Sequence, residues 1–427
     1  MKRLGLFAPK WRWLIVVALL ASVTALAACG SDDKSTDSAD AKPAGGSSTT
    51  AASGGCKADG PIKIGGVGGL TGAIPVAEGT EGATAYFNEL NAKGGLCGQK
   101  IDYKVVDDKG DPQASATAAR QLVLRDGVVG MVNESFVDCA VNDKFYRAQK
   151  IKVTGVGVNP ACYTSPVFAM ANNGPTGSLL GNLFFASSKE GLGKTKVCAE
   201  LLRLPGYAGQ FQKARELWEQ QSGLKMTLYD NTLSPTSDPT SYILKAKKAG
   251  CEAVALVGNF ALVPPWMKAV QAQGAGKIAW LWPAPNYVQS LPETLGEAGN
   301  GNVYSDPEME PDITNPDVQH VQTEVAKLNP KNGVTNMHEG GWVSALVIAE
   351  AIKSINGDVT RESLSTALEN LKPVENPFMG GPFTFGPGDS HFANHWIKEA
   401  QIKDGKWQVI SKEWLEIPKI SELYASN

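Results

Sequence analysis

After residue 60, apolar and polar positions follow two alternating patterns along the chain. Short apolar runs, typical of buried strands, are separated by longer stretches with the 3.6-residue spacing of amphipathic helices. The first part of this pattern predicts strands at 62–67, 101–106, 128–132 and 151–156, and helices at 75–90, 112–125 and 140–149. This order is typical of a parallel, doubly wound sheet.

The same alternation starts again after a bridging stretch at 167–173. It predicts helices at 176–189, 207–221, 239–248 and 263–273, and strands at 196–200, 225–229, 252–257, 277–281 and 302–305. Helices at 316–328, 339–355 and 361–371 follow, then a short segment at 382–385 and strands at 395–401 and 407–410. In open α/β sheets, ligands bind outside the carboxyl ends of the strands. We therefore expect an α/β protein with two doubly wound, Rossmann-like lobes whose crevices face each other across one cleft.

Residues 1–28 are predicted to be a lipoprotein signal peptide. Basic residues precede an apolar run at 14–28, whose core is shorter than the roughly 20 residues of a stable membrane span. The run ends in Leu26-Ala27-Ala28-Cys29, which resembles the bacterial lipobox. We expect Cys29 to carry the lipid and to anchor the protein at the extracytoplasmic face of the cell membrane. Cleavage that leaves an unmodified cysteine is the alternative.

Residues 29–60 are predicted to be a flexible linker, because Ser, Thr, Ala, Gly and Asp offer little surface to bury. The rest of the chain has room for two domains. The net charge of −3 gives no basic excess for binding phosphates, so we expect no nucleic-acid partner.

Six cysteines remain when Cys29 is set aside, and an even number outside the cytosol is typical of disulfides. Six cysteines allow 15 pairings. We favour the pairs that would lie on or beside neighbouring strands: Cys56 with Cys97, Cys139 with Cys162, and Cys198 with Cys251. Buried free thiols, above all for the last pair, are the alternative.

Motifs for cofactors and catalysis are incomplete. The glycine-rich run 66–72 has Thr71 where a dinucleotide fingerprint needs its third glycine, and 191–195 leads into a strand, unlike a phosphate loop. We expect Asp111 to cap the helix that Pro112 opens and not to bind calcium. No GxSxG or HExxH motif occurs. We expect no cofactor, no metal and no enzymatic activity.

Several short motifs together resemble one transport family. They are Lys63-Ile64-Gly65-Gly66, Leu70-Thr71-Gly72, Asn91-Ala92-Lys93-Gly94-Gly95 and Asp107-Asp108-Lys109-Gly110-Asp111-Pro112. In this respect the chain is similar to the leucine/isoleucine/valine-binding proteins of branched-chain amino-acid ABC transporters. The resemblance implies a type I periplasmic-binding-protein fold with a hinge of three crossovers. One lobe would comprise 61–173 and 307–392, and the other 174–306 and 393–427.

The resemblance also implies a set of ligand-binding residues. The loops containing Glu134-Ser135-Phe136 and Gly157-Val158-Asn159 match segments that hold an α-carboxylate, and Tyr207 and Phe260 match aromatic residues of the second lobe. The full predicted set is Leu70, Thr71, Glu134, Ser135, Phe136, Gly157, Asn159, Tyr207, Phe260, Trp282, Ala284 and Asn286. Ordinary packing is the alternative role for Tyr207 and Phe260.

One departure from the family pattern leaves the ligand open. The family has a glutamate that accepts the ligand's ammonium where this chain reads Trp282-Pro283-Ala284-Pro285-Asn286. A buried ammonium without an acceptor costs several kcal/mol. Either Glu134, Asp138 or Glu78 replaces that glutamate, or the ligand is a carboxylate, amide or aromatic acid, with Trp282, Tyr287 and Phe136 as flat apolar walls.

The resemblance implies a monomeric solute-binding lipoprotein that takes up a branched-chain amino acid, or one of these related molecules, for an ABC permease and its ATPase subunits. A ligand sensor of the same fold, and an extracytoplasmic enzyme on this scaffold, are the alternative functions.

Overall fold

The computed structural model describes residues 55–72, 75–204, 206–258, 260–331, 333–385 and 394–425. The predicted signal peptide, Cys29 and most of the predicted linker lie outside these ranges. Within them, every helix is too short or too polar to cross a membrane.

The first sheet has five parallel strands in the order β3-β2-β4-β5-β6. Their bounds are β2 Ile62–Gly68, β3 Ile101–Asp107, β4 Gly130–Asn133, β5 Val153–Gly155 and β6 Phe168–Met170. The chain reverses its direction of winding between β2 and β4. The carboxyl ends of these two strands therefore flank a crevice of the kind in which doubly wound sheets bind ligands.

The second sheet repeats this strand order and adds two antiparallel strands, giving β15-β14-β11-β10-β9-β7-β8. Its strands are β7 Val197–Leu202, β8 Leu228–Leu233, β9 Ala253–Val257, β10 Ala279–Trp282, β11 Val303–Ser305, β14 Ala400–Lys403 and β15 Lys406–Val409. The equivalent crevice lies between β7 and β9. The expected fold class, two doubly wound α/β lobes, is confirmed, whereas the predicted residue boundaries of the lobes stay predictions.

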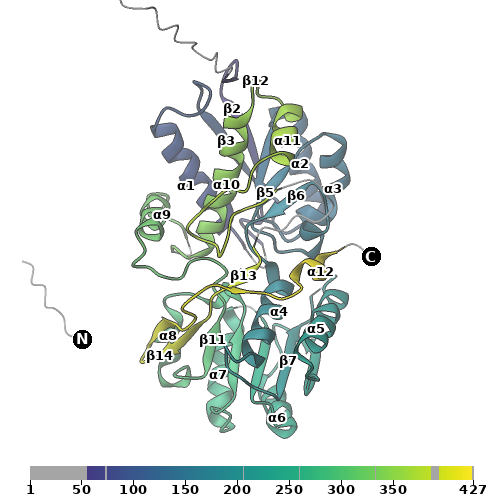
Figure 1. The fold of residues 1–427 in the computed structure, drawn as a ribbon, viewed down its shortest axis with the longest axis vertical. Coiled ribbons are helices and arrows are strands. Elements are labelled where there is room, and N and C mark those ends of the chain that lie inside the picture. The colour runs from purple at the N-terminus through teal and green to yellow at the C-terminus, as the bar shows by residue number, and fades with distance from the viewer. Residues whose placement is uncertain are drawn as a thin grey trace, which may run out of the picture. The chain divides into compact units, whose positions relative to one another are not determined.

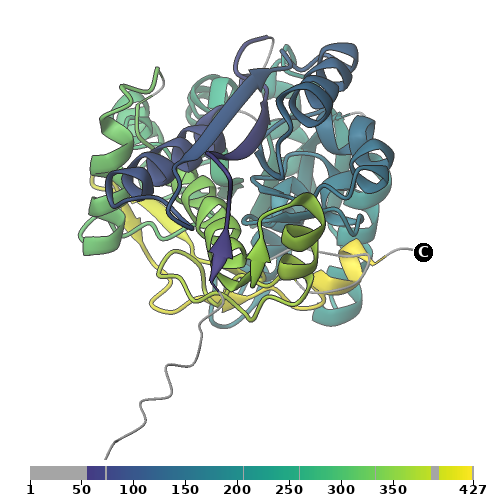
Figure 2. The same cartoon turned by 90° about the horizontal axis from the view of Figure 1, so that it is seen from above.

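Helices cover both faces of each sheet, as parallel strands require. Helices α1 (Glu78–Ala92) and α10 (Met337–Ser354) lie on one face of the first sheet, and α2 (Pro112–Arg120) and α3 (Asp138–Ala148) on the other (Figures 1 and 2). The remaining helices are α4 Gly174–Ser187, α5 Ala208–Ser222, α6 Pro239–Ala249, α7 Val263–Ala272, α8 Leu291–Leu295, α9 Pro316–Ala326, α11 Arg361–Glu369 and α12 Ile420–Tyr424. As predicted, Asp111 caps α2 by accepting from the N–H groups of Gln113 and Ala114.

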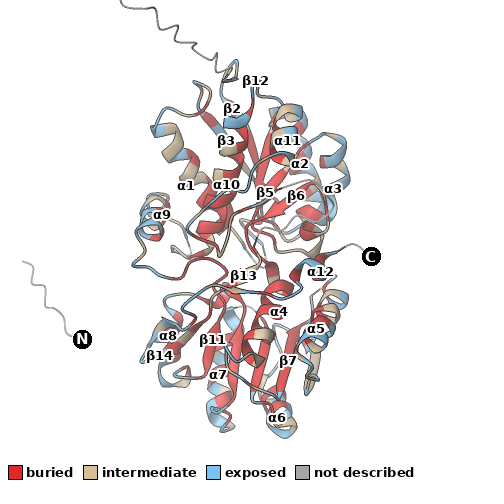
Figure 3. Cartoon of the chain, viewed as in Figure 1, coloured by how far each residue is buried: buried red, intermediate tan, exposed pale blue. Residues whose placement is uncertain are grey.

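Burial follows this layering. The strands and the inner faces of the helices are buried, while the outer helix faces are exposed (Figure 3). In the first sheet, Ile64 and Val132 contact the core under α1 and α10, whereas Val67 and Met131 point to the opposite face. Apolar residues on both faces of a strand explain why these strands read as continuous apolar runs.

The three favoured disulfides are present: Cys56–Cys97, Cys139–Cys162 and Cys198–Cys251. The expected strand proximity explains the third pair, because Cys198 lies in β7 and Cys251 lies two residues before the neighbouring β9. It does not explain the second pair, since Cys139 lies in α3 and Cys162 in a 3-10 helix at Pro160–Tyr163.

Several local expectations differ from the structure; for example, the strand expected at 225–229 is β8 at Leu228–Leu233, and α8 was not expected. The bridging stretch 167–173 contains β6, an edge strand of the first sheet. The predicted linker overlaps β1 (Cys56–Lys57), which pairs with β12 (Gly357–Asp358) and is tied down by its disulfide. The single strand expected at 395–401 is broken into β13 (Trp396–Ile397), which pairs with β16 (Leu415–Glu416), and β14. The helix expected to run to residue 125 continues after Arg120 as a π-helix at Gln121–Asp126.

Candidate functional site

A cavity of about 300 Å³ lies between the strand ends of the two sheets. Segments after β2, β4, β5 and β6 line it from the first lobe, and segments after β7, β9 and β10 line it from the second. Residue 308, beyond β11, and the start of α10 complete the wall. This volume is at the lower end for small-molecule sites. The cavity occupies the position at which doubly wound sheets bind ligands.

Apolar side chains make up most of the wall. They include Val76, Phe136 and Val158 from the first lobe, and Leu202, Leu204 and Val257 from the second. Side chains with polar groups are those of Glu78, Glu134, Asn172, Tyr287, Glu308, Thr335 and Asn336. Such a wall suits a small ligand with an apolar body and few polar groups.

Glu134 comes directly after β4 and is 3% exposed. Its backbone continues the pairing with β2, because the N–H of Gly69 donates to its carbonyl oxygen at 3.0 Å. Its side-chain Oε2 accepts from the N–H of Gly79 in the first turn of α1 at 2.7 Å. Burial raises the pKa of Glu134 well above its usual value, and the nearby charge of Glu78 raises it further.

Glu308 lies in the segment that leaves β11 and crosses from the second lobe to the first. It is also 3% exposed, and its backbone N–H donates to Oδ1 of Asp306 at 2.9 Å. Burial, followed by repulsion from Asp306, raises the pKa of Glu308 well above its usual value. Its backbone is also held by Asn394, which lies two residues before β13: the side-chain amide of Asn394 donates to the carbonyl oxygen of Glu308 at 2.7 Å.

Five of the predicted ligand-binding residues line the cavity: Glu134, Phe136, Gly157, Phe260 and Ala284. Their backbone positions at strand ends explain this. Glu78, a candidate acceptor for a ligand ammonium group, and Tyr287, a candidate apolar wall, line the cavity as well.

Seven others lie behind the wall or away from it: Leu70, Thr71, Ser135, Asn159, Tyr207, Trp282 and Asn286. The hydroxyl of Thr71 donates to Asp107, and that of Ser135 to Asp108. The amides of Asn159 and Asn286 donate to the backbone carbonyls of Phe136 and Gly258. Direct contact of these residues with a ligand stays a prediction.

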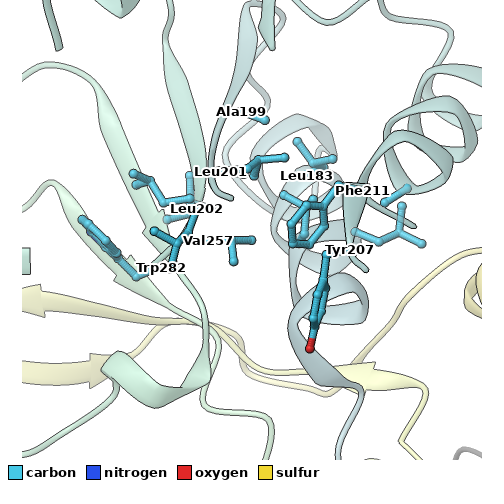
Figure 4. Close-up of a cluster of buried hydrophobic side chains, with 14 of the residues drawn as sticks. Leu183, Ala199, Leu201, Leu202, Tyr207, Phe211, Val257 and Trp282 are labelled. Carbon is cyan, nitrogen blue, oxygen red and sulfur yellow. The ribbon is translucent and has the colours of Figure 1, made fainter. Parts of the chain in front are cut away.

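Trp282 and Tyr207 pack within the second lobe. Trp282 is fully buried and lies beside Val257 (Figure 4). Its ring and that of Trp266 form an edge-to-face contact with centroids 5.8 Å apart. Trp280 contacts the same Trp266, and residues i and i+2 of a strand share a face. That spacing was an available sign that Trp282 belongs to the core.

The ring of Tyr207 packs on Phe211 at 5.3 Å, with its hydroxyl pointing away from the apolar cluster (Figure 4). That hydroxyl donates to the carbonyl of Val158, in the loop after β5. Tyr207 therefore joins the two lobes behind the cavity.

Asp138, the third candidate acceptor for a ligand ammonium group, already has hydrogen-bond partners within the protein. It accepts from the side chains of Asn133, Asn142 and Tyr146 at 2.7–2.8 Å and does not line the cavity. Glu308 is the acidic wall residue that the sequence analysis did not predict, and the polar wall residues Asn172, Thr335 and Asn336 were not predicted either. The available sign was the acid-rich run Asp306-Pro307-Glu308-Met309-Glu310 directly after a strand.

Comparisons with known proteins agree with this geometry. Residues 61–406 match the periplasmic binding protein family. A Leu/Ile/Val-binding protein homolog 3 of Brucella melitensis is 28% identical over 209 residues, which are 47% of this chain and 55% of that protein. The chain thus spans little more than half of that relative.

Two solved structures share the fold. A fatty acid ABC transporter substrate-binding protein from Thermomonospora curvata has a TM-score of 0.68 at 18% identity, covering 85% of this chain and 94% of that one. A solute-binding protein of an R. palustris ABC transporter, in complex with 4-hydroxybenzoate, has a TM-score of 0.68 at 17% identity, covering 84% and 98%. The family match covers most of the chain and places it among binding proteins and not among enzymes. The chain belongs to the periplasmic binding protein family.

Proposed function

We propose that this protein is the extracytoplasmic substrate-binding component of an ABC importer and that it holds a small molecule in the cavity between its lobes. The main support for this proposal is that the cavity lies at the carboxyl ends of the strands of both sheets, so that one ligand contacts both lobes. Segments of the chain cross between the lobes and form a hinge. A ligand that contacts both lobes stabilises their closed arrangement by its differential affinity.

Three further elements belong to the proposal. Cys29 carries a lipid that holds the protein at the membrane, and the residues after it act as a tether. The protein works as a monomer and delivers its ligand to a permease driven by ATPase subunits. The similar proteins are a Leu/Ile/Val-binding protein homolog, a fatty acid ABC transporter substrate-binding protein and a solute-binding protein in complex with 4-hydroxybenzoate, which supports a small ligand with an apolar body for this chain.

A thermal-shift screen tests the proposal. Amino acids, aliphatic and aromatic acids, amides and amines are added singly, and a true ligand raises the unfolding temperature because it binds only the folded state. Small-angle scattering with that ligand then shows a smaller radius of gyration. The absence of stabilisation by every compound class would contradict the proposal. Labelling with a radioactive fatty acid in a bacterial host, compared with Cys29→Ser, tests the anchor.

A further inference from the structure

The cavity wall is unbalanced in charge. Glu78, Glu134 and Glu308 contribute three carboxyl groups, and the described lining residues include no Lys, Arg or His. None of these three acids takes part in an ion pair among the described residues. Glu134 and Glu308 are buried, and the protein supplies them with few donors: the N–H of Gly79 donates to Glu134, and the side-chain amide of Asn172 bonds to Glu308. Buried acids normally have a cationic partner or several hydrogen-bond donors, so these two groups are an exception that calls for a partner.

The hydrogen-bond donors of the wall are largely used within the protein. The side chain of Asn172 bonds to both the N–H and the carbonyl of Gly157, at 2.7 and 2.9 Å. The side-chain amide of Asn336 donates to the carbonyl of Pro307. The wall thus offers carboxyl oxygens to a ligand and few side-chain donors. An anionic ligand group would meet three acids there, with little to compensate its loss of water.

Glu134 and Glu308 line the same cavity and are held in place by different elements. Glu134 is held by the N-terminal turn of α1 through Gly79, and Glu308 by the crossover segment. The ionisable groups that face Glu134 are Glu78 and Glu81 on α1 and Tyr103 on β3, and His338 of α10 lies 3.1 Å from Glu81. Those that face Glu308 are Asp306, Tyr163 and Tyr424. Neither set supplies a cation that contacts Glu134 or Glu308.

We propose that the ligand carries a positively charged nitrogen on a compact apolar body, and that Glu134 and Glu308 bind this nitrogen. The inference rests on the proposed function and names its substrate class, an apolar amine or an amino acid with an apolar side chain. The carboxylate pair replaces the missing acid of the 282–286 segment with groups from the first lobe and the crossover. The cation supplies the counter-charge that the described residues of the wall do not provide.

Proton release accompanies binding under this proposal. Burial favours the neutral form of both acids in the empty cavity, and an ammonium group favours their ionised forms. Protons therefore leave the protein when the ligand binds, and affinity for an ammonium compound rises with pH until the amine itself loses its proton.

Two matched series of probes test the substrate class by isothermal titration calorimetry on the purified chain. The aliphatic series is isopentylamine, L-leucine and isocaproate, and the aromatic series is phenethylamine, L-phenylalanine and hydrocinnamate. Within each series the apolar body is similar, while the charge changes from cation to zwitterion to anion. We expect the amine or the amino acid of at least one series to bind at least tenfold more tightly than the anion. Titrations in phosphate and in Tris buffer should show proton release.

The variants Glu134→Gln and Glu308→Gln test the residues. Each keeps the shape of the side chain, and each should weaken binding of the cationic probe at least tenfold and reduce the proton release. Glu375→Gln is the matched control, because Glu375 is exposed and outside the cavity. Thermal unfolding of each variant identifies a folding defect, and Glu134 and Glu308 provide independent tests if one variant does not fold.

The outcomes separate this inference from the proposed function. Binding of an anion with proton uptake, without binding of either amine or amino acid, overturns the cationic class and leaves the proposed function standing. Unchanged affinity of the cationic probe in both variants overturns the assignment of the residues. Failure of every probe, together with failure of the thermal-shift screen, overturns both.

Discussion

The close approach of α1 to α10 gives the sharpest test of the packing that positions Glu134. A Cβ atom placed on Gly82 of α1 would lie 2.0 Å from the carbonyl oxygen of His338 in α10, where ordinary contacts begin at 3.4 Å. A backbone carbonyl cannot turn away as a side chain does, so the two helices must separate. The variant Gly82→Ala is therefore expected to disturb the helix that presents Gly79 to Glu134.

The expected change in the free energy of unfolding is the difference between two opposing effects. Overpacking of a rigid core costs about 1–3 kcal/mol, and a backbone contact belongs at the upper end of that range. Alanine in a helix gains about 1 kcal/mol over glycine. We expect Gly82→Ala to lower the free energy of unfolding by roughly 2 kcal/mol.

Gly209→Ala in α5 is the matched control, because a Cβ at Gly209 meets nothing within 4 Å. It should raise stability by about 0.5–1 kcal/mol. Urea unfolding followed by tryptophan fluorescence measures both variants. Equal effects of the two substitutions would refute the inferred close contact between α1 and α10.

Three further predictions concern the rest of the structure. Burial raises the pKa of Glu200 to about 8, so the free energy of unfolding of the wild type should fall as pH rises from about 4.5 to 8. The free energy of unfolding of Glu200→Gln should equal that of the wild type near pH 4.5 and exceed it by a few kcal/mol at pH 9. Parallel pH profiles of urea unfolding for the two proteins would contradict this. Replacing Cys198 and Cys251 together by alanine opens a loop with a sequence separation of 53 residues and should lower the free energy of unfolding by roughly 4 kcal/mol in the same assay. A loss below about 1 kcal/mol would contradict the expectation that this disulfide restricts the unfolded chain. Tyr207→Phe removes the hydroxyl that donates to Val158 across the lobes, so the ligand-free protein should show a larger radius of gyration by scattering; an unchanged profile would mean that this bond does not hold the lobes together.

Much of the fold could be predicted because its strands are buried on both faces and stand out as apolar runs between amphipathic helices. The exceptions are elements with too few residues to show a period. Strand β6 has three residues, Phe168–Met170, and β1 has two, Cys56–Lys57. Their pairing depends on residues distant in the sequence, in β5 and β12.

The sequence predicted those residues of the candidate site whose place on the cavity wall follows from the position of the backbone alone. Glu134, Phe136 and Gly157 line the cavity because they follow strand ends. Trp282 also ends a strand, but its side-chain direction depends on Trp266, which comes from another element. Glu308 was missed because its place on the wall follows from the path of the crossover, which no local periodicity encodes.

Hydrogen–deuterium exchange with a bound ligand tests the central claim, that one ligand is held by both lobes at once. With a ligand from the thermal-shift screen, the account predicts slower exchange in two sets of segments together: residues 134–137 and 157–159 of the first lobe, and 257–262 and 283–288 of the second. Protection confined to one lobe, or located away from these segments, would contradict it.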